Sequence, residues 1–349
     1  MKSIHNPLNL EVSLKEHPRS RWSGGRPLAV FLVRRLLSAA GTLVVVSALL
    51  YFVTNVLPGN VALVVLGKNA TPARVQALDV RLGYNHSIVI RYLDWLGGVL
   101  HGNFGQSAVA VALHNPQTAI SSTLSSPLSN SLILAAIASL LLIPLTLILG
   151  GIAGLFAGRK LDNLISGPLL VSGGLPEFVT GSLLILVFFN TLNLLPPISF
   201  LGPGQSPFSE TKALVLPVVT LLAVTVGSGA RQVRAGVVEV LRGDYVQYAR
   251  LNGVNERRIV IWYVLRNALA TSVQVIAQNL QYLAGGIIVV ESIFDYPGIG
   301  VYLVQAVQAR DTNKVLAAAI ILAAFYVLIN ILADVIVVYL VPKLRTEMA

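Results

Sequence analysis

The sequence predicts an all-α integral membrane protein with six transmembrane helices. Apolar residues make up 55% of its 349 residues and charged residues only 11%, whereas soluble domains carry about 25% charged residues. Long uncharged runs recur along the chain, and a helix needs about 20 apolar residues to cross a bilayer. We therefore expect spans near 29–57, 129–157, 164–190, 213–235, 265–290 and 315–341.

The basic residues predict how these spans are oriented. If the N-terminus is cytoplasmic, 18 of the 25 Lys and Arg residues fall in cytoplasmic segments and seven fall outside. Cytoplasmic loops of membrane proteins are normally enriched in Lys and Arg. We therefore expect a multi-pass protein with both termini in the cytoplasm. Its net charge of +10 then reflects topology and contact with anionic lipid, and we expect no nucleic-acid partner.

Polar segments flank the spans at the N-terminus and on the outer side. We expect a flexible cytoplasmic arm over 1–27, with the alternative that it lies on the membrane, a six-helix domain over 28–345 and a short tail over 346–349. The extracytoplasmic region 58–128 carries its own helix signals. Pro72 is suited to start a short helix and Gly83 to end it, 88–100 has apolar positions at helical spacing, and 102–105 is typical of a tight turn.

A polar, Arg-rich segment, 244–267, stands between two apolar spans. Asp244 can cap a short helix, Gly253 can end it in the left-handed conformation, and Asn255 can cap a second helix that has Glu256 in its first turn. We interpret this as a helical hairpin, within a cytoplasmic loop over 240–266, that is offered to a soluble partner. Two alternatives are a DNA-reading helix-turn-helix and a solvated loop whose charges only set topology.

The fifth span carries a polar stripe. Its members recur at spacings of three and four residues and so share one helix face; they are Asn267, Thr271, Gln274, Gln278, Gln281 and Gly285. A polar stripe on a membrane helix must face protein or water. It therefore lines a translocation pathway, for which Gln274, Gln278 and Gln281 are the candidates, or it bonds to a partner membrane protein.

Four carboxylates lie within or at the ends of the spans. A charge left in lipid costs a few kcal/mol, so Glu177, Glu291 and Asp334 should face the protein interior or a wet surface. We expect Asp334 to pair with a polar group on a neighbouring helix. At the outer mouth, the candidates for a gate or a receptor contact are Glu291, Asp295, Pro297 and Gly298. The alternative is that Glu291 is a helix-end carboxylate bonded to its neighbours.

The sequence contains no recognisable catalytic, nucleotide or metal site. No G-x-x-x-x-G-K-[ST] motif occurs, there are no cysteines, and the five histidines are scattered over the N-terminal arm and the outer loop. A membrane-bound enzyme therefore lacks a candidate nucleophile, base or metal cluster. We expect no cofactor bound by this chain.

The chain resembles the permease subunits of binding-protein-dependent ABC importers, specifically the first permease of the dipeptide, oligopeptide and nickel branch. The resemblance covers nearly all of the sequence. It rests on LPGN, LGYNHSIVIRYLDWLGGVLHGNFGQS, LSNSLILAAIA, DYVQYARLNGVNERRIVIWYVLRNAL, VVESIFDYPGIG and NILADVIVVYLVPKLR, which occur in the family's order.

This resemblance implies a type I importer permease fold in which the hairpin is the coupling loop. Its ATPase-coupling residues would be Asp244, Tyr245, Val246, Gln247, Tyr248, Ala249, Arg250, Asn252 and Gly253. Gln247 and Tyr248 depart from the Glu-Ala-Ala pattern of such loops. The implied partners are a second, paralogous permease, two ATPase subunits or domains that hold ATP and Mg²⁺, an extracytoplasmic binding protein and lipid, in a bacterial or archaeal plasma membrane.

The function that we expect is import of short peptides or similar small solutes. Alternatives are a permease of the same branch for nickel or another solute, and an ion-coupled secondary transporter. The last would need paired intramembrane charges at a broken helix and no cytoplasmic docking hairpin, which does not suit this sequence.

Overall fold

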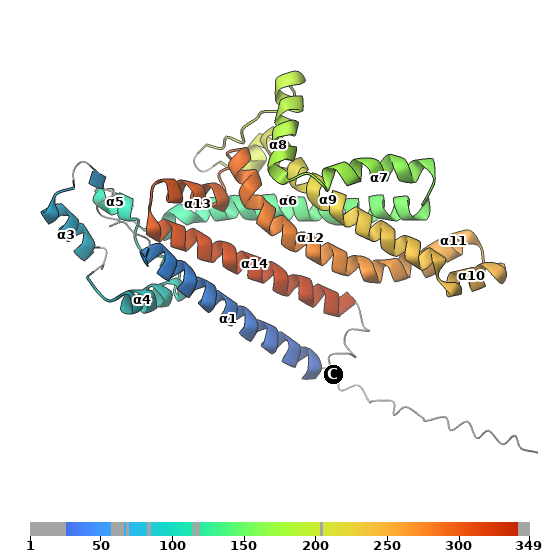
Figure 1. Cartoon of the computed structure of the whole chain (residues 1–349), viewed down its shortest axis with the longest axis horizontal. Helices are drawn as coiled ribbons and strands as arrows, with labels where there is room; N and C mark the ends of the chain where they lie inside the picture. The colour runs from blue at the N-terminus through green and yellow to red at the C-terminus, as the bar shows by residue number, and fades with distance from the viewer. Residues whose placement is uncertain are drawn as a thin grey trace, which may run out of the picture.

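The computed structural model describes residues 26–56, 66–67, 70–81, 85–113, 115, 119–202 and 205–340, and within them it contains helices but no strand (Figure 1). The helices are α1 (Arg26–Val56), α3 (Pro72–Arg81), α4 (Ile88–Leu100), α5 (Ala108–Ala112), α6 (Ile120–Leu155), α7 (Lys160–Ser172), α8 (Glu177–Ile185), η2 (Leu186–Thr191), η3 (Pro207–Glu210), α9 (Thr211–Arg242), α10 (Asp244–Leu251), α11 (Glu256–Arg258), η4 (Ile259–Leu265), α12 (Arg266–Ile293), α13 (Ile299–Gln308) and α14 (Thr312–Leu340).

Five of these helices are long and apolar enough to cross a membrane, namely α1, α6, α9, α12 and α14. Helix α7 and the continuous run of α8 and η2 are bent by 105° relative to each other, and the described residues contain a sixth span if this bent pair is counted as one. The expectation of one straight helix over 164–190 is therefore wrong. Gly173 ends α7, and Pro176, which has no backbone N–H to continue a helix, caps α8.

The bundle is built around α9. In the apolar stretch of α9, 78% of the residues are buried, whereas in that of the peripheral helix α1 only 11% are buried. Leu216 and Leu221 of α9 pack with Leu142 of α6 and with Leu283 and Ile287 of α12 in one hydrophobic core. The peripheral helix α1 is held to α14 by an ion pair between Arg35 and Asp334, with Nη2 and Oδ2 3.0 Å apart. This confirms the expected polar partner for Asp334.

The second span begins earlier than the predicted 129. Helix α6 starts at Ile120, because its first turns are buried: Ile120 and Leu124 pack against Ile299 of α13 and Ala317 of α14. The start of α6 therefore depends on contacts with residues that are far away in the sequence. The Ser-rich, Pro-containing sequence of its first turns did not suggest a helix there.

The described part of the outer region contains three short helices, of which the sequence predicted α3 and α4 but not α5. Helix α3 starts at Pro72 and α4 spans 88–100, and Gly102 and Gly105 both have positive φ in the expected turn. Residues 82–84, which include the expected stop Gly83, lie outside the described residues, as do most of the N-terminal arm and the tail. Helix α4 lies against α1, where the Tyr92 hydroxyl and Ser47 Oγ are 2.9 Å apart.

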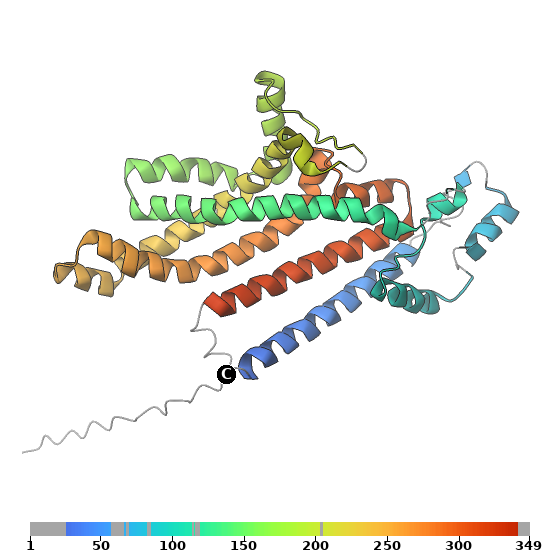
Figure 2. The same ribbon diagram turned by 180° about the vertical axis from the view of Figure 1, so that it is seen from behind.

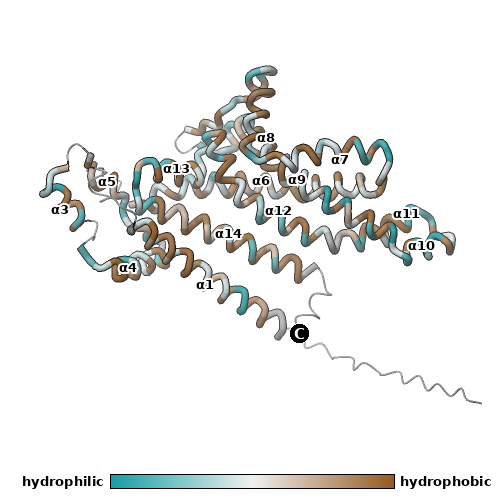
Figure 3. The backbone as a smooth tube through the Cα atoms, in the orientation of Figure 1, coloured by the Kyte–Doolittle hydropathy of each residue, from teal (hydrophilic) through white to brown (hydrophobic). Residues whose placement is uncertain are grey.

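The two polar ends of the molecule lie at opposite ends of the bundle. Helices α3 to α5 form one end and α10 with α11 forms the other (Figures 1 and 2). Hydrophobic residues dominate the helices between them, while hydrophilic residues gather at α3, α10 and α11 (Figure 3). A bilayer crossed by the long helices would therefore separate the hairpin from the outer region.

Candidate coupling hairpin and transport pathway

The hairpin begins directly at the end of α9. Helix α10 starts at Asp244, and its N-cap is Gly243. The prediction that the Asp244 side chain caps the helix is therefore wrong: Asp244 is the first helical residue, where its charge still suits the positive end of the helix. The prediction for Gly253 is confirmed, since its φ of +74° lies in the left-handed region.

The second half of the hairpin runs without interruption into the fifth span. The Asn255 side chain accepts a hydrogen bond of 2.9 Å from the Arg257 backbone N–H, which confirms the predicted cap. Arg250 of α10 donates to Glu256 of α11, with Nε and Oε1 2.7 Å apart. Helices α11, η4 and α12 then follow one another directly along the chain, from Glu256 to Ile293.

The predicted coupling residues divide between two faces of α10. Val246 and Ala249 are buried against Ile259 and Val264 of η4 and against Val237 of α9. The remaining predicted coupling residues are exposed, and Tyr248 retains 71% of its surface. Leu251, which the sequence did not single out, is more exposed still at 86%. The exposed face can meet a partner, while Val246 and Ala249 position it.

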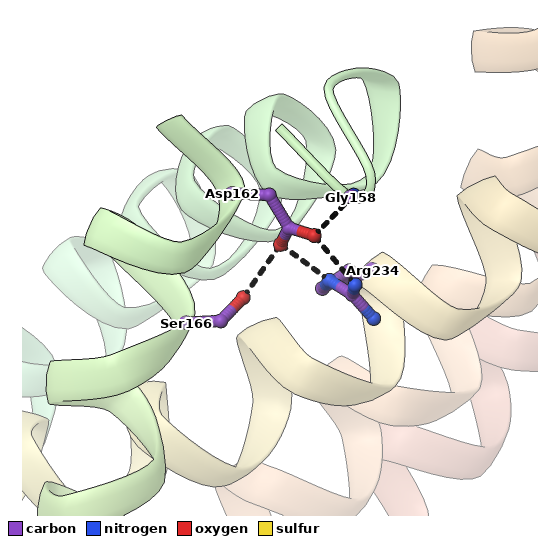
Figure 4. A network of polar contacts seen from close by, with 4 residues as sticks. All are labelled: Gly158, Asp162, Ser166 and Arg234. Carbon is purple, nitrogen blue, oxygen red and sulfur yellow. Dashed lines mark hydrogen bonds and ion pairs between the residues drawn. The ribbon is translucent and has the colours of Figure 1, made fainter. Parts of the chain in front are cut away.

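A partly buried ion pair holds the helix that carries the hairpin (Figure 4). Arg234 of α9 donates twice to Asp162 of α7, with both N–O distances 2.7 Å. The Asp162 carboxylate also accepts from the Gly158 N–H and from Ser166 Oγ, each at 2.8 Å. Such a bidentate pair fixes α7 against the half of α9 that leads into the hairpin. Sequence reasoning missed it, because the partners are 72 residues apart.

The C-terminal half of the polar stripe lines a hollow of about 490 Å³. Gln278, Gln281 and Gly285 line it, together with Glu177 of α8 and Tyr326 of α14. Gln274 is exposed but is not among the residues that line the hollow. The Asn267 side chain does not line it either and donates a hydrogen bond to the Tyr263 carbonyl. The expectation that Glu177 faces a wet surface or the protein interior is met at this hollow.

The carboxylate of Glu291 lies inside the outer mouth. Glu291 is fully buried, accepts a hydrogen bond from Ser131 Oγ of α6, and accepts another of 2.6 Å from the Gly300 backbone N–H of α13. It is thus a helix-end carboxylate bonded to its neighbours, and in this conformation it cannot touch a docking protein. A role in gating stays a prediction.

A second set of bonds closes the same corner. The Asn130 side chain donates to the Pro297 carbonyl at 2.9 Å, and the Tyr296 hydroxyl donates to the Asn130 carbonyl at 2.8 Å. Burial raises the pKa of Tyr296, which keeps its hydroxyl protonated as this donor. These bonds tie α6 to the turn between α12 and α13.

Gly298 is required at this turn for a reason that the sequence did not suggest. Its φ of −101° is open to any residue, and the positive φ belongs to Asp295, at +45°. A Cβ atom on Gly298 would instead overlap the Glu291 carboxylate. Asp295 is exposed beside this turn, so it is the carboxylate of the pair that can reach a docking protein.

The sequence of this chain matches two family models. Residues 146–346 match the model described as binding-protein-dependent transport system inner membrane component, and residues 28–125 match the corresponding N-terminal model. A solved amino acid ABC transporter with histidines covers 62% of this chain and 92% of its own, with a TM-score of 0.48 and 16% identity.

Curated relatives extend over most of the chain. A putative peptide transport system permease protein of Brucella abortus is 29% identical over 320 residues, which cover 92% of this chain and 100% of the relative. The metal-staphylopine import system permease protein of Staphylococcus aureus is 29% identical over 319 residues, covering 90% and 98%. Because the first family model matches more than half of its residues, this chain belongs to the binding-protein-dependent transport system inner membrane components, the permease subunits of ABC importers.

Proposed function

We propose that α10 is the coupling helix of this permease and that it docks on a partner ATPase, which holds the ATP and Mg²⁺. The supporting observation is the division of α10 into a buried face, packed on η4 and α9, and an exposed face that carries Tyr248 and Leu251. Large exposed apolar side chains on a polar hairpin are typical of an interaction surface. The direct passage from α11 through η4 into α12 relays the ATPase movement to the pathway.

The proposed cargo is a short peptide. Relatives from Brucella abortus and Sinorhizobium fredii are named as peptide permeases. The hollow along α12 presents amide groups and one carboxylate, which can bond to a peptide backbone and its amine. The second candidate is a metal chelate, because a relative of equal identity is named for metal-staphylopine import.

The proposed assembly contains a second, paralogous permease, two ATPase subunits or domains and an extracytoplasmic binding protein, in the plasma membrane of a bacterium or archaeon with both termini cytoplasmic. Helix α8 projects from the bundle in both ribbon views (Figures 1 and 2). Phe178 and Leu183 of α8 and Leu186 at the start of η2 are 46–58% exposed. We assign this arm to the contact with the second permease, where its apolar surface would be covered.

Uptake by the reconstituted complex tests the proposal. Proteoliposomes that contain both permeases and ATP-loaded ATPases are supplied with binding protein and with labelled dialanine, or with a nickel chelate in parallel. We expect ATP-dependent accumulation of dialanine. Accumulation of the chelate alone would favour the second candidate, and uptake driven by an ion gradient without ATP would contradict the importer mechanism.

A further inference from the structure

The hollow on α12 is walled by side chains from three helices. Helix α8 contributes Glu177 and α14 contributes Tyr326, while α12 contributes Gln278, Gln281, Tyr282, Gly285, Gly286 and Val289. Every polar group among these except Glu177 is a neutral amide or hydroxyl. The site therefore combines one negative charge with several hydrogen-bonding groups in a space of about 490 Å³, which can admit part of a small solute.

The backbone fixes the position of Glu177. The bend between α7 and α8 places Glu177 at the first residue of α8, directly after Pro176, where the positive end of the helix favours a carboxylate. Its carboxylate lies over Gly286 of α12, since a Cβ atom there would be 3.1 Å from Glu177 Oε1. The Tyr282 side chain lies beside it.

This carboxylate has no cationic partner in the part of the chain that the structure describes. The ion pairs there join Arg35 to Asp334, Arg234 to Asp162 and Arg250 to Glu256, and the residues lining the hollow include no Lys, Arg or His. An uncompensated carboxylate among membrane helices is costly, and the cost falls when a cation binds beside it.

We infer that Glu177 and the surrounding amides form a binding site for a protonated amine, as found at the N-terminus of a short peptide. An ammonium needs only acceptor oxygens, which Glu177, Gln278 and Gln281 supply. A bare metal ion would need several ligating side chains, and among the described residues no group of three His, Cys, Asp or Glu could hold one. This inference rests on the proposed peptide cargo, and it specifies that the site recognises the positive charge of the peptide amine.

The absence of cysteine from the chain allows a direct electrostatic test. Val289→Cys, at a position that lines the hollow without supplying an acceptor, is introduced into the full complex, and the thiol is labelled with a cationic trimethylammonium-ethyl or an anionic sulfonatoethyl methanethiosulfonate reagent. We expect the cationic reagent to be favoured. Adding Glu177→Gln should lower the ratio of the two rates about tenfold, as expected for removal of one charge at short range in a partly aqueous site. Asp94→Asn, a matched loss of charge at an exposed residue of α4, should leave the ratio unchanged.

Dialanine and N-acetyldialanine then identify the amine. With Glu177 present, dialanine should slow labelling of the Val289→Cys thiol and the acetylated form should not; in Glu177→Gln the two should act alike. Three results would each overturn the site. The first is equal protection by the two peptides with Glu177 present, and the second is a rate ratio that Glu177→Gln leaves unchanged. The third is that neither reagent labels the thiol, because a second permease covers the hollow. If one of these results is obtained while dialanine uptake is normal, only the amine site is wrong and the proposed function stands. If the complex without substitutions takes up no peptide, the proposed function itself is wrong.

Discussion

The carboxylate of Glu291 occupies the space into which any side chain at Gly298 would project. Glu291 closes α12 and Gly298 precedes α13, so their contact sets the angle at the outer mouth. Because the same carboxylate bonds to Ser131 and Gly300, the turn cannot move without breaking bonds that reach α6.

Gly298→Ala is expected to destabilise the complex by about 1–3 kcal/mol, the usual cost of overpacking a filled core. Thermal unfolding of the purified complex measures the loss. In a Glu291→Ala background the same substitution should cost less, because the overlapping carboxylate is gone, and this coupling is read from a double-mutant cycle. Equal costs in the two backgrounds would contradict the proposed clash.

Gly298→Val is expected to reduce ATP hydrolysis stimulated by loaded binding protein more than basal hydrolysis. The reason is that a distorted outer turn would no longer relay docking through α12 to the hairpin. The assay compares the reconstituted complex with and without loaded binding protein. An equal loss of both activities would indicate general misfolding.

Gly253→Asp is expected to abolish uptake and to weaken copurification of the ATPase while the membrane spans stay inserted. The φ of +74° at Gly253 disfavours any side chain with a Cβ, at roughly 1–2 kcal/mol, and the new charge lies beside the exposed face of α10. Gly102→Asp is the matched control, since Gly102 has a φ of +76° at the opposite end of the molecule. ATPase binding that survives Gly253→Asp would argue against the coupling role.

Asp162→Ala is expected to destabilise the complex by roughly 1–3 kcal/mol, the usual cost of leaving a hydrogen-bonding group without its partner, because it removes both acceptors of the partly buried Arg234. Replacing both residues with Leu should cost less than Asp162→Ala alone, since no unpaired charge is left behind. Retention of monodisperse complex after heating reports both effects. A double variant that is weaker than Asp162→Ala would show that the pair itself, and not the unpaired charge, dominates.

Cysteines at Gln274 and Gln278 are expected to react with small water-soluble thiol reagents, and their rates should change when binding protein and ATP are added. Both side chains are exposed on the polar stripe of α12. A cysteine at Leu140, which is 74% exposed on the apolar helix α6, is the control for a lipid-facing position and should stay unreactive. Similar rates at all three positions would argue that the stripe is not the pathway.

Local chemistry determined much of this protein from the sequence alone. The apolar runs predicted the spans, and Pro72, Gly253 and Asn255 predicted helix ends that the structure confirms. These features depend on backbone geometry and capping within a few residues, so a single sequence reveals them. The exposed hairpin and the polar stripe were predictable for the same reason: helical spacing alone puts their residues on shared faces.

Only the tertiary structure decided which polar residues meet. Glu291 bonds to Ser131 across 160 residues, Arg234 to Asp162 across 72, and Glu177 reaches the hollow through a bend that propensity did not predict. The energies of these contacts depend on burial and on the exact distance between helices, which a linear pattern does not contain. Gly298 shows the difference most clearly: the sequence suggested only a gate or a receptor contact, and packing against a carboxylate is the reason that this position holds a glycine.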